Sequence, residues 1–414
     1  MAIPPALRQG DDRIGFVLQL GRSLHVSGYD AHRLEEAMEM ASDKLGLRGQ
    51  FFSTPTSIMS SFGVQDDQQT FLIRVRPGET NLGKLAQVDA VTHDVLEGRK
   101  TPSQGLNALA RIEAAPPPYG PVLTTLAFGL SSGTVAQFLG GARNEVIAGF
   151  TIGMVIGLLS LLAARLPALG RVFAPVAAAI AAAAAAGIAV SGMPISVFTA
   201  TLAGVIVLIP GLTLTTALTE LSSQHLASGT ARFMGAVVTL LGIAFGIAVG
   251  GKVMSLLVGP APQLAAVVPL PGWSVPIALV ILPLAFMVLL RAEWRDAPWI
   301  MMACLLAFFG TRLGARVLGA ELGAFVGAFA TALGSNWYAR ITNRPAPITL
   351  VPGLLLMVPG SIGIRSLDAL VASRGADDVI GGVDSAFKMV LIAISLVSGI
   401  LIANAVSPRR RLLS

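Results

Sequence analysis

Cysteine is almost absent from this sequence. The one cysteine among 414 residues is Cys304, which lies within an apolar stretch. A disulfide framework needs at least two cysteines and a cysteine-ligated zinc site needs more, so both are excluded. Histidine is also rare, and His25, His32, His93 and His225 are scattered along the chain. Their spacing favours surface or core roles over a metal site or catalysis.

Charged residues are scarce as well, at 13% of the chain against roughly 25% in soluble domains. Hydrophobic residues make up 54%, so the composition excludes both a disordered chain and a single soluble domain. Residues 1–115 hold 12 Lys or Arg and 14 Asp or Glu, whereas residues 116–414 hold 17 and 9. The net charge of +6 therefore belongs to the apolar part. Such charge is typical of membrane edges rather than of a nucleic-acid-binding surface.

Two enzyme motifs are matched only in part. The stretch from Gly246 to Lys252 has the spacing of a phosphate-binding loop, but Val253 replaces the required Ser or Thr and no strand precedes it. Residues 129–133 match the pattern of a serine nucleophile elbow, but they lie in an apolar segment rather than at a strand-to-helix turn. We therefore expect neither an ATP-driven pump nor a hydrolase. The sequence predicts no catalytic residue, no metal site and no cofactor.

The first 115 residues predict a small soluble α+β domain. No apolar core follows the charged residues 1–13, so we expect no signal peptide and place this domain in the cytoplasm. Periodicity, capping residues and β-forming residues predict the order ααβββαα. The predicted helices are 14–26, 30–45, 81–96 and 101–112, and the predicted strands are 51–54, 57–62 and 69–75. Residues 116–120 contain three consecutive prolines and form a stiff linker.

The remaining sequence predicts an α-helical polytopic membrane protein. Ten apolar segments follow one another, each close to the ~20 residues that cross a bilayer core. They are 121–140, 145–164, 172–190, 195–216, 231–251, 273–290, 298–315, 319–338, 348–364 and 386–405. An even number of spans and the basic cluster at 409–411 place both termini in the cytoplasm of a cell with an inner membrane.

An internal repeat divides these ten segments into two halves. Residues 204–221 and 353–370 align with a constant shift of 149, which pairs Pro210-Gly211 with Pro359-Gly360. Each half then holds five spans, and an odd number inverts the second half relative to the first. The predicted units are residues 121–251 as the first repeat, 252–272 as a connecting loop, 273–406 as the second repeat and 407–414 as a basic tail.

The paired Pro-Gly steps predict two broken helices. Proline removes a backbone donor, and the freed backbone groups must line protein or water rather than lipid. We therefore expect the substrate site between the two breaks, near the middle of the bilayer, for a small zwitterionic or anionic solute. Asn336 could instead bridge two helices. The residues expected to bind substrate are Pro210, Gly211, Thr213, Thr215, Thr216, Asn336, Pro359, Gly360, Ser361 and Arg365.

Acidic residues within apolar segments are costly and predict proton coupling. Glu145 and Glu321 are the first candidates, followed by Glu220 and Asp384. The alternative for each is a helix cap or a local ion pair. Three spans also carry Gly at every fourth position, which predicts close helix packing. These glycines are 149, 153 and 157, then 242, 246 and 250, then 319, 323 and 327.

Several motifs are similar to those of the threonine/serine exporter family of bacterial membrane proteins. Early in the chain, Gly28 is followed by His32-Arg33-Leu34-Glu35 and by Thr54-Pro55-Thr56. The membrane part carries Ile209-Pro210-Gly211, Asn343-Arg344-Pro345-Ala346, Val351-Pro352-Gly353 and Val358-Pro359-Gly360-Ser361. The resemblance covers nearly the whole chain. It implies a cytoplasmic domain, ten spans and export of threonine and serine driven by the proton motive force.

Other functions remain open at the level of sequence. A dicarboxylate exporter, a membrane-anchored sensor or scaffold, and a passive channel would share most of these features. Matched helix breaks favour a transporter over a scaffold, and acidic residues in the spans favour it over a channel. The expected partners are a small amino acid, protons and the lipid bilayer, with a homo-oligomer left open.

Overall fold

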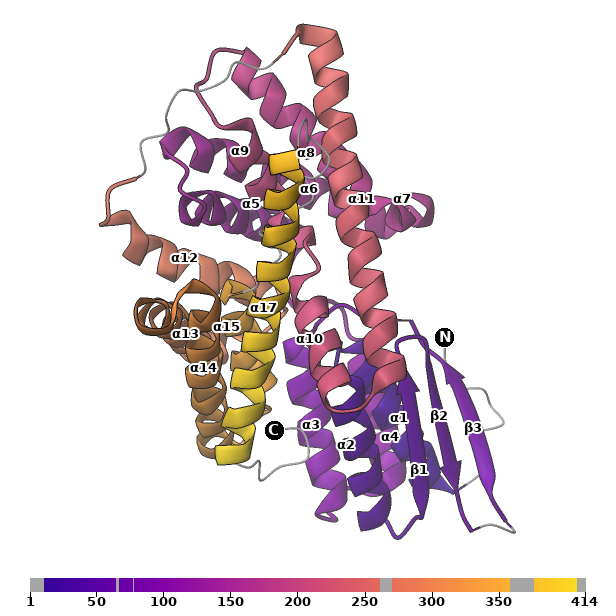
Figure 1. Cartoon of the computed structure of the whole chain (residues 1–414). Helices are drawn as coiled ribbons and strands as arrows, with labels where there is room; N and C mark the ends of the chain where they lie inside the picture. The colour runs from indigo at the N-terminus through magenta and orange to yellow at the C-terminus, as the bar shows by residue number, and fades with distance from the viewer. Residues whose placement is uncertain (1–10, 65–66, 77, 261–269, 358–375, 408–414) are drawn as a thin grey trace.

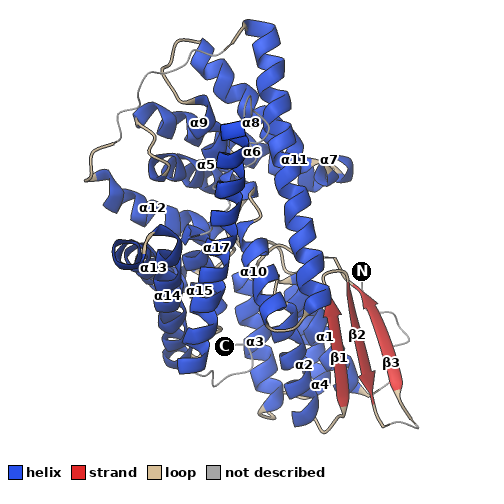
Figure 2. Cartoon of the chain, in the orientation of Figure 1, coloured by secondary structure: helices blue, strands red, loops and turns tan. Residues whose placement is uncertain are grey.

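The computed structural model describes residues 11–64, 67–76, 78–260, 270–357 and 376–407. The described chain is mostly helical, with one small sheet near the N-terminus (Figures 1 and 2). The helices that follow residue 120 form two groups, and the N-terminal elements pack beside the lower part of them in the view of Figure 1. We call the N-terminal elements, from residue 12 to residue 114, the head.

The head has the order of elements that the sequence predicts. Its strands form an antiparallel sheet in the order β1-β2-β3, with Phe52 opposite Met59 and Met59 opposite Leu72. The other face of the sheet contributes Ile58 and Phe62 to the buried core beneath the helices. The elements are α1 (Asp12–Val26), α2 (Ala31–Lys44), β1 (Gly49–Thr54), β2 (Ser57–Phe62), β3 (Gln69–Arg74), α3 (Leu82–Leu96) and α4 (Pro102–Ala114).

Local sequence signals set the ends of the head helices. The Asn81 side chain accepts a hydrogen bond from the backbone N–H of Lys84 at 2.9 Å and so caps α3. Thr101 and Gln104 form a capping box at the start of α4. Gly98 ends α3 with a φ of +73°, a left-handed conformation that favours glycine.

A helix lies in each of the ten apolar segments. Among the described residues, five helices are long and apolar enough to cross a membrane, or six if α9 and α10 are one bent span. The helices are α5 (Pro121–Phe138), α6 (Arg143–Arg165), α8 (Phe173–Val190), α9 (Val197–Gly204), α10 (Gly211–Ser222), α11 (Leu226–Val258), α12 (Ser274–Leu289), α13 (Ala297–Leu318), α14 (Ala320–Thr342), α15 (Pro347–Met357) and α17 (Ala376–Val406). Three short elements connect them: α7 (Pro167–Arg171), η2 (Ile206–Leu208) and η3 (Trp294–Asp296).

The first predicted helix break is present. α9 ends at Gly204, η2 follows, and α10 begins at Gly211 with Pro210 as its N-cap residue. The two parts are bent by 49° relative to each other. The partner break at Pro359-Gly360 lies outside the described residues.

Three helices of the first half have counterparts about 149 residues later in the chain, at nearly matching start and end positions. Shifted by this interval, α6 falls on 292–314, α8 on 322–339 and α11 on 375–407, where α13, α14 and α17 lie. In Figure 1, α11 leads away from the head whereas α17 leads back toward its level, so these two equivalent helices run in opposite directions.

The repeated glycines of the alignment also pack against equivalent helices. A Cβ on Gly204 would lie 2.4 Å from Cγ2 of Ile152 on α6, with α8 also nearby. A Cβ on Gly353 would lie 2.5 Å from Cγ2 of Thr331 on α14, with α13 also nearby. Both glycines therefore allow a helix approach that any larger residue would obstruct.

The glycines at every fourth position confirm the packing interpretation. On α11, a Cβ at Gly246 would lie 2.2 Å from the carbonyl O of Pro175, and one at Gly250 would lie 2.1 Å from that of Ala179. The same spacing brings α6 against α5 and α14 against α13. Close backbone approach is thus a general feature of the helix packing here.

We expect Gly250→Ala to destabilise the α8–α11 pair, because its methyl group has no space beside Ala179. Overpacking of this kind typically costs about 1–3 kcal/mol. Gly251→Ala is the matched control, since nothing lies within 4 Å of its added Cβ. Thermal melting of the two purified variants in detergent measures the difference, and equal melting temperatures would contradict this packing.

A second prediction concerns His25 in the head core. The side chain is 3% exposed, and its Nε2 lies 3.1 Å from the carbonyl O of Thr54. Burial lowers the pKa of the His25 imidazole below its usual range, because a charged ring would lose its hydration. The folded state therefore favours the neutral ring, whose Nε2–H can donate to Thr54.

Below about pH 6.5 the unfolded chain binds a proton at this histidine that the folded chain does not bind. The His25 contribution to stability should therefore fall as the pH drops through that value. His25→Gln keeps a donor for Thr54 but removes the titration, so the variant should lose less stability than the wild type on acidification. Parallel melting curves between about pH 7.5 and pH 5.5 test this. Equal losses in the two proteins would argue against a neutral His25.

Candidate functional site

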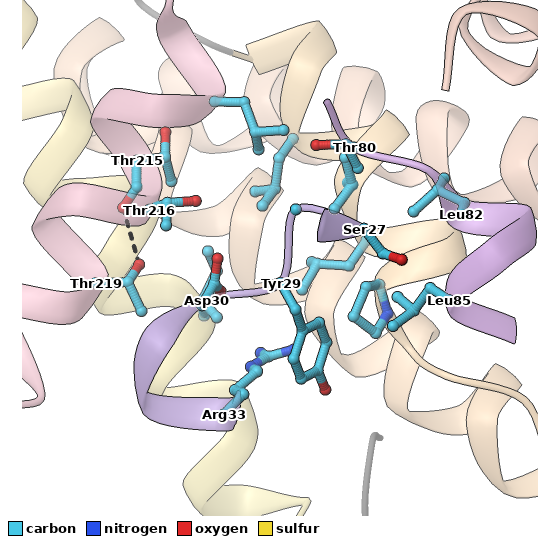
Figure 3. Close-up of a pocket in the computed structure, with 17 residues that line it drawn as sticks. Ser27, Tyr29, Asp30, Arg33, Thr80, Leu82, Leu85, Thr215, Thr216 and Thr219 are labelled. Carbon is cyan, nitrogen blue, oxygen red and sulfur yellow. Dashed lines mark hydrogen bonds between the residues drawn. The ribbon is translucent and has the colours of Figure 1, made fainter. Parts of the chain in front are cut away.

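A cavity of about 50 Å³ lies where the head meets the helices that follow the break (Figure 3). This volume exceeds the roughly 10–15 Å³ that one water molecule needs, so the cavity can hold water. The head contributes residues from the α1–α2 turn and from the start of α3. The membrane part contributes one face of α10, the first half of α15 and Ile400 of α17.

One face of α10 supplies the hydroxyl groups of the cavity. Leu212, Thr215, Thr216 and Thr219 line it, and their spacing of three and four residues puts them on the same side of the helix. The structure therefore places two of the predicted threonines in the cavity. Thr213 lies on a different side of α10 and is not part of the lining.

The three threonine hydroxyls of this face differ in their freedom to bind a solute. Thr215 donates its hydroxyl to the carbonyl O of Gly211 at 3.1 Å, and Thr219 donates to that of Thr215 at 2.9 Å. Both can still accept a hydrogen bond but have no donor left. The half-buried Thr216 has no hydrogen-bond partner within the described part of the chain, so its hydroxyl can either donate or accept.

The head presents two opposite charges to the cavity. Asp30 and Arg33 lie at the start of α2, and Tyr29 lies beside Arg33 (Figure 3). Asp30 occupies the N-cap position but makes no side-chain capping bond. Arg33 is only 5% exposed. Sequence reasoning gave neither residue a role in binding, although Arg33 lies in a motif that carries the family resemblance.

Glu220 fastens the head to the membrane helices. Its side chain is fully buried and accepts hydrogen bonds from the backbone N–H of Ala31 and from the hydroxyl of Ser228, both at 2.8 Å. Its Oε1 also lies 3.1 Å from Nε of Arg232 on α11. One carboxylate thus joins α2 of the head to α10 and α11.

A second acidic residue extends this contact. Glu35 on α2 accepts a hydrogen bond from the backbone N–H of Ser53 at 2.5 Å, and its Oε2 lies 3.2 Å from Nε2 of His225. Burial raises the pKa of the Glu35 carboxyl above its usual range, because the ionised form is poorly hydrated there. The ring of His225 also lies 5.9 Å from that of His32.

The head touches a second connection between membrane helices. The backbone N–H groups of Leu82 and Gly83 donate to the carbonyls of Leu290 and Arg291 at 2.9 and 3.1 Å. A Cβ on Gly83 would lie 2.6 Å from the Arg291 oxygen, so only glycine allows this approach. The start of α3 is thereby fixed against the α12–α13 connection.

The structure places the other predicted residues away from the cavity. Glu145 caps α6 by accepting from the backbone N–H of Ala142 at 2.8 Å, and it also accepts from that of Ser196 at 2.7 Å. Asn336 donates to the side-chain oxygen of Asn404 at 3.1 Å and bridges α14 and α17. Both side chains therefore have hydrogen-bond partners within the protein.

The remaining predicted residues either do not line the cavity or lie outside the described residues. Glu321 is half-buried at the start of α14. Asp384 forms an exposed ion pair with Lys388 at 2.7 Å. Gly211 is buried and Pro210 half-buried at the break, without lining the cavity. Pro359, Gly360, Ser361 and Arg365 lie outside the residues that the structure describes.

A polar cluster near the start of α15 escaped the sequence analysis. Arg344 lies 3.0 Å from both Glu293 and Asp296, and the hydroxyl of Tyr338 donates to Asp296 at 2.9 Å. The only signal in the sequence was that Arg344 belongs to one of the family-like motifs. The cluster holds the α12–α13 connection against the end of α14.

Comparison with known proteins identifies two family models along the chain. The model described as "Putative threonine/serine exporter" matches residues 15–254. The model described as "Threonine/Serine exporter, ThrE" matches residues 276–406. No solved structure matches the chain.

Several curated relatives are fungal membrane proteins. A protein named "Pheromone-regulated membrane protein 10" from Candida albicans is 27% identical over 380 residues, which cover 88% of this chain and 34% of the relative. The protein of the same name from Kluyveromyces lactis is 25% identical over 407 residues, covering 93% and 42%. An uncharacterized protein of Schizosaccharomyces pombe is 30% identical over 243 residues, covering 57% and 32%. The chain thus spans about a third to two fifths of the length of these relatives.

We expect removal of the Glu220 carboxylate to loosen the head. Glu220→Ala would leave Arg232 and the first amide of α2 without their buried partner, which should cost about 3–5 kcal/mol of stability. Glu79 pairs with Arg291 across the same boundary but is 83% exposed, so Glu79→Ala should cost at most about 1 kcal/mol. Proteolytic susceptibility and melting of the purified full chain measure both effects. Similar behaviour of the two variants would show that Glu220 does not hold the head.

Proposed function

Because the chain belongs to the threonine/serine exporter family, we propose that it is a secondary transporter that exports small amino acids such as threonine and serine. The proton motive force supplies the energy. The observation that carries this proposal is the cavity beside a broken membrane helix, lined by hydroxyl groups and by one charge of each sign. Such a lining suits a small hydroxylated zwitterion.

We also propose that the membrane part is a ten-span bundle built from two inverted halves. The recurrence of helix bounds at 149 residues and the opposite directions of α11 and α17 support this arrangement. The two family models divide the chain at the same place, between residues 254 and 276. An odd number of spans in each half would produce the inversion.

In the proposed topology, the head lies in the cytoplasm of a cell with an inner membrane. It contacts the α10–α11 and α12–α13 connections, and the cavity also includes Pro347 at the start of α15. If the chain crosses the membrane ten times and its N-terminal part is cytoplasmic, both connections and the start of α15 lie on the cytoplasmic side. The head would then cover the inner end of the transport path.

Glu220 is the best-placed carrier of the coupled proton. It is buried beside cavity-lining Thr219, and its contact with Ala31 adjoins cavity-lining Asp30. Protonation would remove its charge attraction to Arg232 and loosen the start of α2. Proton binding and opening of the cavity would thereby be coupled. The two contacts of Glu145 with backbone N–H groups favour a structural role for that residue.

A dicarboxylate exporter is the second candidate, and a sensor or scaffold is the third. The cationic Arg33 in the cavity favours an anionic group on the solute, which a dicarboxylate also has. A scaffold would not require a cavity with hydroxyl groups and two opposite charges beside a broken helix. Direct measurement of transport separates these functions.

Efflux from loaded proteoliposomes under an imposed pH gradient tests the proposal. We expect the full chain to release threonine and serine faster than succinate, and release should stop when an ionophore collapses the gradient. Failure to release either amino acid would overturn the proposed function, and release of succinate alone would favour the dicarboxylate exporter.

Glu220→Gln should uncouple the proton from transport. The amide oxygen of glutamine can still accept from the backbone N–H of Ala31, and its NH2 group can donate to the Ser228 hydroxyl, so the head remains in place while the titratable group is lost. We expect gradient-driven efflux to fall at least about tenfold while exchange of internal for external threonine continues. Asp384→Asn, at an exposed ion pair far from the cavity lining, is the control. Full gradient-driven efflux in Glu220→Gln would assign the proton to another residue.

A further inference from the structure

Arg33 is a buried cation without a counter-charge. It is 5% exposed, and its Nε has no hydrogen-bond partner. Within the described residues, no carboxylate lies within the 4.0 Å that defines an ion pair with it. Arginine side chains carry their positive charge in proteins. Burying an uncompensated charge costs several kcal/mol, which an anionic ligand in the cavity would offset.

Asp30 provides the opposite charge in the same cavity. Its carboxylate makes no capping bond to α2 and forms no ion pair among the described residues, although Arg33 follows only three positions later. Asp30 precedes the helix as its N-cap residue, and Arg33 lies in the first turn of α2. Both line the cavity separately, with the threonine face of α10 close to Asp30 (Figure 3).

We propose that Arg33 and Asp30 form a clamp for the zwitterionic part of an α-amino acid. Arg33 binds the carboxylate through its planar guanidinium, and Asp30 binds the ammonium group. The free hydroxyl of Thr216 then meets a hydroxyl on the substrate side chain. This inference rests on the proposed function, and it adds that the soluble head supplies the charges that select the substrate.

The charge pattern separates amino acids from dicarboxylates. A zwitterion satisfies one cation and one anion together. Succinate would satisfy Arg33 but would place its second carboxylate against Asp30 or leave Asp30 without a partner. Succinate would therefore bind more weakly, both because its second carboxylate is repelled by Asp30 and because Asp30 lacks an ammonium partner. An amino alcohol or a hydroxy acid would each satisfy only one half of the clamp.

The test compares four probes on the purified full chain, with binding measured by the ligand-dependent shift in melting temperature. The probes are L-threonine, L-threoninol (which lacks the carboxylate), 3-hydroxybutyrate (which lacks the ammonium group) and succinate. Arg33→Met and Asp30→Asn each remove one charge while nearly conserving volume. Arg111→Met and Asp43→Asn are matched controls, because both side chains are exposed and lie outside the cavity lining.

We expect the wild type and both controls to prefer threonine over each single-charge analogue by about tenfold or more. Arg33→Met should lose the preference over threoninol but keep that over 3-hydroxybutyrate. Asp30→Asn should show the reverse pattern. A general loss of folding cannot produce this crossed result, because it would weaken all probes together.

Efflux by the wild type, measured in parallel, distinguishes a failure of the clamp from a failure of the proposed exporter function. Threonine efflux with unchanged analogue preferences in both cavity variants would overturn the clamp and leave the exporter function standing. Absence of both efflux and binding in the wild type would overturn the exporter function and the clamp together. The crossed pattern in the presence of efflux supports both.

Discussion

The buried carboxylate of Glu220 determines how the head packs against the membrane helices α10 and α11. Glu220 is buried at the end of the broken span, where it needs several donors to offset its lost hydration. Arg232 and Ser228 come from the next helix, and the first amide of α2 comes from the head. The cavity exists because this arrangement holds the α1–α2 turn over the threonine face of α10. The contacts of Leu82 and Gly83 with the α12–α13 connection hold the head on the other side of the cavity.

The sequence predicted the local structure well because local physics determines it. Capping by Asn81, the turn at Gly98 and the break at Pro210 each depend on residues within one or two helical turns. Helical phase also explains why Thr215 and Thr216 share a face that Thr213 does not. That distinction was available from the sequence, since 213 is one position away from the series 212, 215, 216 and 219.

The assembly of the site could not be predicted in the same way. Asp30 and Arg33 lie about 190 residues from Thr219 and Glu220 along the chain, and no periodicity connects such distant segments. The same limit applies to Glu145, whose partner Ser196 decides that it caps a helix, and to Asn336, whose partner is Asn404. An acid or amide in an apolar segment indicates that a polar partner must exist. Only the fold shows whether that partner is backbone, another side chain or a solute.

In the proposed clamp, placing the selective charges on the head would have a physical advantage for a transporter. An arginine and an aspartate within a lipid-exposed span would each carry a large cost of insertion. On the head the two charges lie outside the membrane-spanning helices of the proposed topology, and those helices contribute hydroxyl and apolar groups to the cavity. In the proposed arrangement of two inverted halves, the head lies at one end of the transport path, and the covered cavity can form at that end. In the proposed orientation, the selective charges act where cytoplasmic solute enters, and a solute leaving on the far side would no longer be held by them.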